Sequence, residues 1–273
     1  MIKMALITPT SYLKQFASQS DGVHLCLAHL AKPGSDYVQF YESLPRENSH
    51  VICDNGAFEL GESLSPAMLL DKAALFNPDT IVLPDYPGKD YRKTIEATIS
   101  FLKDVASHSY VRQRIEAKRP IKWMFVPQSL RGDVSGWCEG YRWASEQEEI
   151  SWIGMSILGI PNAWDTVPAH LSRYYCGEFL MTNNMLSQKT HHYLGSFGYP
   201  QEYPLLSKQG IAYSSDTSSP VWHGYHDIAF DRSVWGLIGG KLSSKVNFDA
   251  PMKGDATNRI IQYNIDQLKE LAK

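Results

Sequence analysis

The chain has only four cysteines, and none of them has the spacing of a metal site or a disulfide framework. They lie far apart and form no C-x-x-C pair: Cys26, Cys53, Cys138 and Cys176. A structural zinc site or a set of disulfides requires cysteines that are closer together or more numerous. We therefore expect reduced thiols, no bound metal, no cofactor and a cytoplasmic protein.

Long apolar runs and an excess of one charge are also missing. No stretch approaches the ~20 apolar residues of a membrane-spanning helix, and the opening "MIKMALITPTSY" turns polar too early for a signal peptide. We expect no association with membranes. The net charge is −3 at pH 7, so no global basic field marks a nucleic-acid-binding protein, although a local patch can serve that purpose.

One run of positive charge is dense enough to be such a patch. It consists of Arg112, Arg114, Lys118, Arg119 and Lys122. A solvated helix face with a linker is the favoured interpretation of this run, and a nucleic-acid contact is the alternative. The adjacent His191 and His192 have no Cys or carboxylate partner at ligand spacing, which argues against a metal role for them.

Short apolar runs that end in polar residues recur along the chain and alternate with helix-like stretches. We count eight: 23–30, 50–56, 79–85, 121–129, 150–159, 191–198, 210–216 and 233–240. Eight such runs in a chain near ~250 residues favour a (β/α)8 TIM barrel, in the α/β class, that spans 1–273 as one domain. A doubly wound sheet is the alternative, but its G-x-G-x-x-G fingerprint after the first strand is missing.

Helices are expected between these runs where apolar residues recur at helical spacing. The expected ranges are 90–107, a segment through Trp143, a segment around 164–175, and an amphipathic helix over 256–273.

In a barrel, the active site lies at the carboxyl ends of the strands. Those ends carry Asp54, Asp85, Gln128, the segment 154–156 and Asp216. An Asp after a strand is usually a helix cap or a turn residue. Three carboxylates and one amide at one rim would nevertheless converge on a single pocket.

A purine base suits such a pocket. Its N1–H and exocyclic amine donate hydrogen bonds to a carboxylate, and its carbonyl accepts from an amide. Phe58, four residues after Asp54, is placed to stack on the ring. Two remaining carboxylates would perform glycosyl chemistry, one as nucleophile and one as proton shuttle.

These strand ends resemble those of the tRNA-guanine transglycosylases, (β/α)8-barrel enzymes that exchange a guanine for a 7-deazaguanine without cutting the backbone. "CDNGAFELG" (53–61) resembles the family segment D-S-G-G-F-Q. The resemblance implies that Asp54 is the general acid/base and that Phe58 stacks on the base. "VLPDYP" (82–87) resembles the strand that ends in a base-recognising Asp, which corresponds to Asp85.

Three further segments follow in family order. "FVPQS" (125–129) is similar to the segment whose Gln reads the base, here Gln128. "WIGMSILG" (152–159) resembles a Gly-rich run, which implies that the backbone of Gly154, Met155 and Ser156 lines the base pocket. The stretch 192–216 resembles the segment that ends in the family nucleophile, here Asp216.

The chain departs from the tRNA enzymes in three places. The C-x-C-x-x-C … H zinc module after the nucleophile loop is absent. The acidic residue that helps to accept an aminomethyl substituent falls near Ile160, which favours an uncharged 7-substituent such as the nitrile of preQ0. The basic loop after the nucleophile becomes "TSSPVWHG", without an Arg.

A short, zinc-free version of this family resembles the DpdA-type enzymes, which insert 7-deazaguanines into DNA and include compact phage-encoded forms. The resemblance implies a pentosyltransferase with DNA as partner, in the host cytoplasm if a phage encodes it. Lys241 and Lys245 in "GGKLSSK" (239–245) would contact phosphates. The alternatives are a tRNA enzyme and a non-catalytic nucleic-acid-binding barrel. Trp222 would either wedge against a flipped-out nucleotide or pack into the barrel wall.

Overall fold

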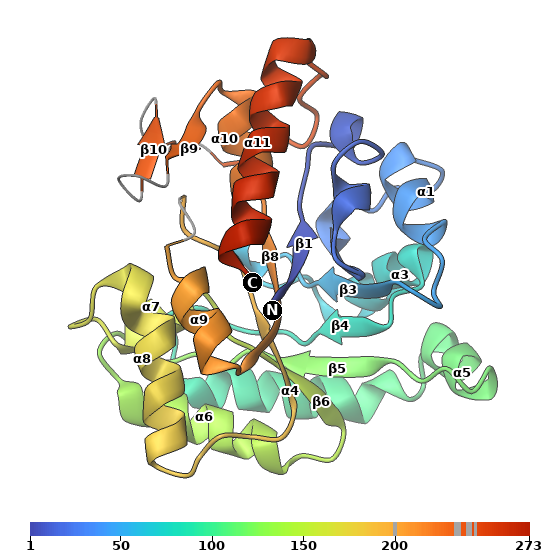
Figure 1. The fold of residues 1–273 in the computed structure, drawn as a ribbon. Helices are drawn as coiled ribbons and strands as arrows, with labels where there is room; N and C mark the ends of the chain where they lie inside the picture. Colours follow the sequence, from blue (N-terminus) through green and yellow to red (C-terminus); the bar gives the residue numbers. More distant parts are fainter. Residues whose placement is uncertain (199–200, 232–235, 239–241, 243–244) are drawn as a thin grey trace.

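Eight parallel strands form the centre of the computed structural model, which describes residues 1–198, 201–231, 236–238, 242 and 245–273 (Figure 1). The strands are β1 (Lys3–Leu6), β2 (Val23–Leu27), β3 (His50–Asp54), β4 (Thr80–Val82), β5 (Lys122–Phe125), β6 (Ile150–Gly154), β7 (Thr190–Tyr193) and β8 (Ala212–Thr217). They are hydrogen-bonded in the order β1-β8-β7-β6-β5-β4-β3-β2. Because β1 and β2 also lie in contact, the sheet is a nearly closed barrel. The fold is the expected (β/α)8 TIM barrel.

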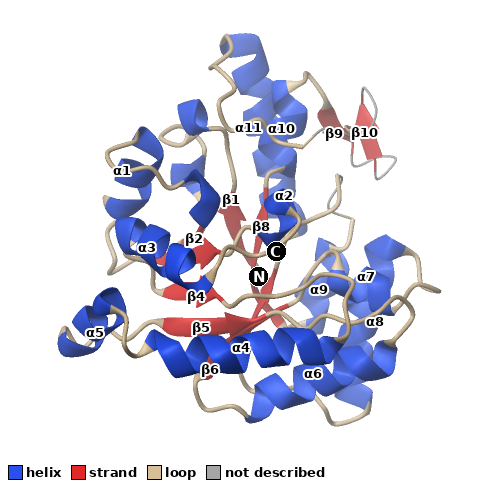
Figure 2. Cartoon of the chain, turned by 180° about the vertical axis from the view of Figure 1, so that it is seen from behind, coloured by secondary structure: helices blue, strands red, loops and turns tan. Residues whose placement is uncertain are grey.

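Helices surround the barrel (Figure 2). They are α1 (Asp36–Glu42), α2 (Ala57–Leu60), α3 (Pro66–Phe76), α4 (Tyr91–Val105), α5 (Ser109–Glu116), α6 (Val134–Glu146), α7 (Gly159–Ala163), α8 (Ala169–Thr182), α9 (Tyr203–Gln209), α10 (Ser219–Tyr225) and α11 (Asp255–Leu271). Short 3₁₀ turns cover 10–12, 17–19 and 28–30. Within the described residues, no helix combines the length and apolarity that crossing a bilayer requires.

The expected helices are present, and one begins later than predicted. The helices expected over 90–107, through Trp143 and at the C-terminus correspond to α4, α6 and α11. The segment expected around 164–175 is α8, which starts at Ala169 and has Pro168 as its N-cap in extended geometry. Proline disfavours the helical conformation in the residue before it, which favours a helix start after Val167.

One of the eight predicted strands was wrong. The first barrel strand is β1, at the N-terminal "KMAL", and the run 233–240 supplies no barrel strand among its described residues. Residues 236–238 form β10 (Gly236–Ile238), which pairs antiparallel with β9 (Ala229–Asp231) in a separate two-stranded sheet. The rest of that run lies outside the described residues. The apolar run at the N-terminus was considered only as a signal peptide. Its length does not explain why it was missed, since β4 has three residues and lies in a predicted run.

The barrel interior is packed with apolar side chains. They are Ala5, Val23, Leu25, Leu27, Ile52, Val82, Met124, Val126 and Trp152. The outward side chains of the same strands pack against the helices in two larger clusters. Since side chains alternate between the two faces of a strand, both faces of these strands are buried. The polar residues of the interior are therefore confined to the strand ends and to one wall, formed by β7 and β8.

Candidate active site

Asp216 lies near the carboxyl end of β8 and points into the barrel. It stands opposite Ala5 in the β1–β8 register, and Ala5 belongs to the interior cluster. The side chain of Asp216 is 7% exposed. Its Oδ1 accepts two hydrogen bonds, from the backbone N–H of Gly195 at 3.0 Å and from Nε2 of His192 at 3.1 Å. The predicted nucleophile is thus buried and held by two donors.

His192 connects Asp216 to a second residue of β8. Its Nδ1 lies 2.8 Å from the Oγ of Ser214, which is its register partner across β7 and β8. The histidine is completely buried. Sequence reasoning considered His192 only as a metal ligand and missed this role. The available signal was the alternation of Ser214 and Asp216, which places both side chains on one face of β8.

Asp54 ends β3 in a tight turn. Gly56 has φ +80°, a left-handed conformation that glycine adopts without strain, and its N–H donates to Asp54 Oδ2 at 2.9 Å. Burial raises the pKa of Asp54 well above its usual value, and the negative charges of Glu59, Asp85 and Asp216 raise it further. The predicted general acid therefore tends to hold a proton.

Asp85 lies between two amide side chains. Asn55 Nδ2 donates to Asp85 Oδ1 at 2.7 Å, and Gln128 Nε2 donates to Asp85 Oδ2 at 2.6 Å. Burial raises the pKa of Asp85 to about 6, while these two hydrogen bonds favour the charged form and limit the rise. Both donors come from turns after neighbouring strands, so the structure brings the two predicted base-recognising residues, Asp85 and Gln128, into direct contact.

Phe58 and Lys245 meet at the rim. The Phe58 side chain is 52% exposed, and Lys245 Nζ lies 5.4 Å from the centre of its ring. The same Nζ donates to the carbonyl oxygens of Phe58 at 3.4 Å and Glu59 at 3.3 Å. An exposed ring beside a cation suits base stacking and a phosphate contact. Lys241 lies outside the described residues.

Glu59 is a carboxylate that sequence reasoning did not single out. Burial and the charge of Asp216 raise its pKa, and Lys245 opposes the rise. Its Oε2 is buried and has no hydrogen-bond partner among the described residues. It gives the mouth a fourth acidic group, although no cluster of metal-ligating side chains occurs in the described part of the chain.

The segment 154–156 differs from its predicted role. Met155 is completely buried in the core outside the barrel. Its N–H donates to the carbonyl of His192 at 2.7 Å, and its carbonyl accepts from the N–H of Leu194 and from Arg173. Ser156 Oγ accepts from the first N–H groups of the segment that enters α7. The N–H and the carbonyl of Met155 are thus both hydrogen-bonded within the protein and are not available to a base.

Gly154 is needed for space. A Cβ atom at Gly154 would lie 2.8 Å from Leu194 Cδ1 and 2.9 Å from Val126 Cγ2. Those distances are shorter than van der Waals contact, so any larger residue at this end of β6 would force the Leu194 and Val126 side chains to shift. The absence of a side chain at Gly154 lets the side chains of Leu194 and Val126 pack closely against β6.

A buried ion pair supports the strand ends from outside. Arg173 and Glu202 are both fully buried and form a two-pronged contact, in which Arg173 Nε donates to Glu202 at 2.8 Å. Arg173 also donates to the carbonyls of Leu194 at 3.1 Å and Gly195 at 2.8 Å. Because the Gly195 N–H holds Asp216, the ion pair fixes the loop that positions the carboxylate.

Trp222 packs into the protein. It lies in α10, is 7% exposed, and stacks on Tyr225 with ring centres 5.2 Å apart. Of the two roles considered for it, the structure supports packing. The hydroxyl residues around Asp216 have structural partners: Ser215 Oγ donates to the carbonyl of Tyr193 at 2.7 Å.

The basic run lies far from the acidic mouth. It belongs to α5 and to the start of β5, the amino end of a strand, whereas the acidic residues follow the carboxyl ends. Arg114 is buried and donates to Asn77 Oδ1 at 2.7 Å and to the carbonyl of Pro78 at 2.6 Å. Arg119 lies 3.6 Å from Asp79. Arg114 therefore departs from the expected solvated face, whereas the other four residues of the run are exposed as that interpretation expects.

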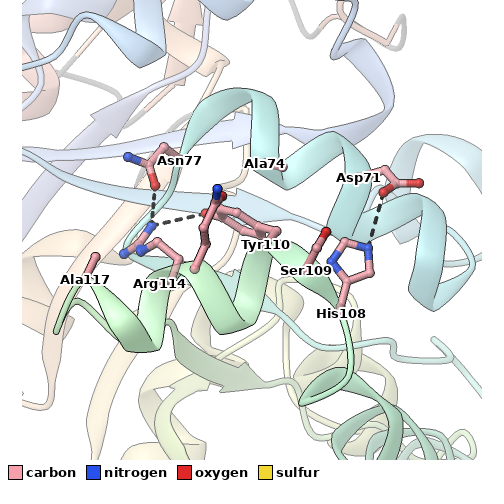
Figure 3. A pocket seen from close by; sticks show the side chains of 9 residues that line it. Asp71, Ala74, Asn77, His108, Ser109, Tyr110, Arg114 and Ala117 are labelled. Carbon is pink, nitrogen blue, oxygen red and sulfur yellow. Dashed lines mark hydrogen bonds and ion pairs between the residues drawn. The ribbon is translucent and has the colours of Figure 1, made fainter.

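A pocket of about 510 Å³ lies beside this run, between α3 and α5 (Figure 3). Its polar side chains are directed toward one another. Arg114 contacts Asn77 and the hydroxyl of Tyr110, and His108 Nε2 lies 3.2 Å from Asp71 Oδ1. The groups that could perform chemistry are thus paired, and none of the strand-end carboxylates lines this pocket.

The fold and the mouth define a (β/α)8 barrel with an acidic site at the carboxyl ends of its strands. No protein-family model matches the chain, and no curated protein sequence matches it.

Proposed function

We propose that the chain is a transglycosylase that exchanges guanine in DNA for a 7-deazaguanine base such as preQ0. The observation that carries the proposal is the pair of aspartates at one barrel mouth. Asp216 is held at one oxygen by two N–H donors, and the raised pKa of Asp54 is partly due to the charge of Asp216. Paired carboxyl groups in different environments are the usual arrangement for nucleophilic glycosyl transfer.

The first half-reaction replaces a C–N bond with a C–O bond. An oxygen of Asp216 attacks C1′ of the target nucleotide, and the bond from C1′ to N9 of guanine breaks. The electron pair stays on the base, which receives the proton of Asp54. The products are a glycosyl-aspartate ester, a neutral guanine and the carboxylate of Asp54.

The second half-reaction reverses these roles. Asp54 removes the N9 proton of the incoming base, and N9 attacks C1′. The ester bond breaks and the electron pair returns to Asp216 as a carboxylate. Two inversions at C1′ retain the configuration, and one glycosidic bond replaces another without an external energy source.

Asp85 and its amide partners suit the recognition of guanine. With a pKa of about 6, Asp85 is ionised at neutral pH and accepts hydrogen bonds from the N1–H and amine of the base. Phe58 is exposed for stacking. The absence of the zinc module that the resembling tRNA enzymes carry favours DNA, whose target guanosine must be flipped out of the stack at a cost of about a few kcal/mol.

The test is to incubate the protein with labelled preQ0 or guanine and with single-stranded DNA, duplex DNA or tRNA. Incorporation into DNA is expected, together with a covalent protein–DNA adduct on a denaturing gel. Asp216→Asn abolishes both, whereas Asp71→Asn, which removes an exposed carboxylate on α3, changes neither. Labelling of tRNA alone would overturn the DNA assignment. The absence of any label and any adduct would overturn the transglycosylase and favour a binding barrel.

A further inference from the structure

The two oxygens of Asp216 are not equivalent. Both donors, His192 Nε2 and the N–H of Gly195, reach Oδ1. No donor among the described residues reaches Oδ2. An oxygen that accepts two hydrogen bonds has its lone pairs engaged, and the other oxygen keeps its lone pairs available.

The hydrogen-bond chain determines where His192 carries its proton. A carboxylate accepts only, so Nε2 must bear a hydrogen to bond Asp216. In the neutral ring, Nδ1 then accepts from the hydroxyl of Ser214, 2.8 Å away. In the protonated ring, Nδ1 donates to the same Oγ. The Ser214 hydroxyl can therefore bond Nδ1 in the neutral and in the protonated ring, and Nε2–H faces Asp216 in both.

We propose that His192 is the positioning residue of the nucleophile: it fixes Asp216 through Oδ1, directs Oδ2 to C1′, and stabilises the carboxylate as it leaves the sugar. This inference rests on the proposed transglycosylase. In the ester the charge of Asp216 is gone and the hydrogen bond from Nε2 is weak. When the ester breaks, the negative charge returns next to that donor and the hydrogen bond strengthens.

The two half-reactions should therefore respond differently to loss of the donor. Formation of the adduct consumes a carboxylate that the donor had stabilised, so removing the donor makes Asp216 more nucleophilic, which offsets any loss of geometry in this step. Breakdown of the adduct regenerates the carboxylate, so it loses an interaction that grows in the transition state. Removal of one such donor lowers a rate by about 10²-fold.

Three variants separate positioning from structure. His192→Leu removes the donor. His192→Gln restores an N–H donor at a similar reach. His191→Gln is the matched control, because His191 is the adjacent residue, is also buried, and bonds Tyr141 outside the barrel at 2.8 Å.

The experiment measures adduct formation with unlabelled DNA, followed by a chase with preQ0. For His192→Leu we expect breakdown to slow by about 10²-fold and the steady-state fraction of adduct to rise. His192→Gln should recover most of the rate, and His191→Gln should match the wild type. Equal slowing of both steps, or equal losses in His192→Leu and His192→Gln, would overturn the inference while the transglycosylase stands.

A second measurement needs no substrate. Nitrogen NMR of histidine-labelled protein reports which ring nitrogen carries the hydrogen. The expected result is a protonated Nε2 on His192 and a change at Nδ1 in Ser214→Ala. A hydrogen on Nδ1 alone would overturn the inference. A wild type that forms no adduct with any nucleic acid overturns the proposed function, and the role of His192 falls with it.

Discussion

Gln128 donates to Asp85 across 2.6 Å, from the turn after β5 to the turn after β4. This contact makes the ionisation of Asp85 depend on its neighbour. Below pH 6 Asp85 takes up a proton and loses its ability to accept from guanine, so kcat/KM should fall in acid. Gln128→Leu removes a hydrogen bond that favours the charged form, so the acidic limb should move to higher pH. A pH profile of kcat/KM for the two proteins checks this, and an unmoved limb contradicts it.

The stability of the fold should also depend on Asp85. Its pKa of about 6 in the folded protein exceeds the value of about 3.9 in an unfolded chain. Folding therefore takes up a proton between these values, and the stability from Asp85 is greatest below pH 4 and falls as pH rises through 6. Urea denaturation at pH 4.5 and pH 7 should show a smaller loss for Asp85→Asn than for the wild type. Equal losses would argue against the raised pKa.

Phe58 should contribute to binding more than to folding, because its ring is 52% exposed. Stacking of a base on an aromatic ring is worth about 1–3 kcal/mol, so Phe58→Ala should raise KM by about 5- to 150-fold and leave the free energy of unfolding nearly unchanged. Phe58→Tyr should retain binding. Leu60→Ala, at the neighbouring exposed apolar residue of α2, serves as the control. Parallel losses in both alanine variants would argue against stacking.

Lys245 should contribute one charge contact with the phosphate backbone. Lys245→Ala is expected to weaken DNA binding and to reduce the slope of log K against log salt by about 1. The control is Lys122→Ala, since Lys122 is exposed at the amino end of β5, on the far side of the barrel. Fluorescence anisotropy over a range of salt concentrations measures both slopes. If the Lys122 variant changes its slope and the Lys245 variant does not, DNA binds elsewhere.

The Arg173–Glu202 pair should be sensitive to loss of either partner. Arg173→Met leaves the Glu202 carboxylate buried without its counterion, which costs about 3–5 kcal/mol. Arg142→Ala breaks an exposed pair with Glu139 and should cost less than about 1 kcal/mol. Urea unfolding compares the two. Similar losses of unfolding free energy in the two variants would show that groups other than Arg173 stabilise the buried Glu202 carboxylate.

The sequence predicted the place of a residue in the fold where the pattern lies within a single strand. The segments around Asp54, Asp85 and Asp216 each combine an apolar run with a polar end, and the structure places all three at or just after the carboxyl ends of barrel strands. The strand at Lys3 was not predicted because the apolar run at the N-terminus was considered only as a signal peptide. Without it, the strand that carries Asp216 was counted as the seventh in the ring.

Contacts between side chains on neighbouring strands were harder to predict. His192 and Asp216 are 24 residues apart and meet only because β7 and β8 are neighbours in a certain register. Ligand spacing along the chain could not show that pairing. The backbone of Met155 was expected to face the base for a related reason: its N–H and carbonyl are bonded to the neighbouring β7 segment and to Arg173, and the sequence alone does not show those partners.

The backbone of Gly195 links the outside of the barrel to its mouth. Its carbonyl accepts from Arg173 and its N–H donates to Asp216. With φ +73° and a Cβ position 2.8 Å from Ile157 Cγ2, it also admits no larger residue. The hydrogen bond that holds Asp216 and the contact with the buried Arg173 thus depend on the same residue. On heating, the loss of activity should therefore coincide with global unfolding. Residual activity should then report the fraction of the protein that is still folded.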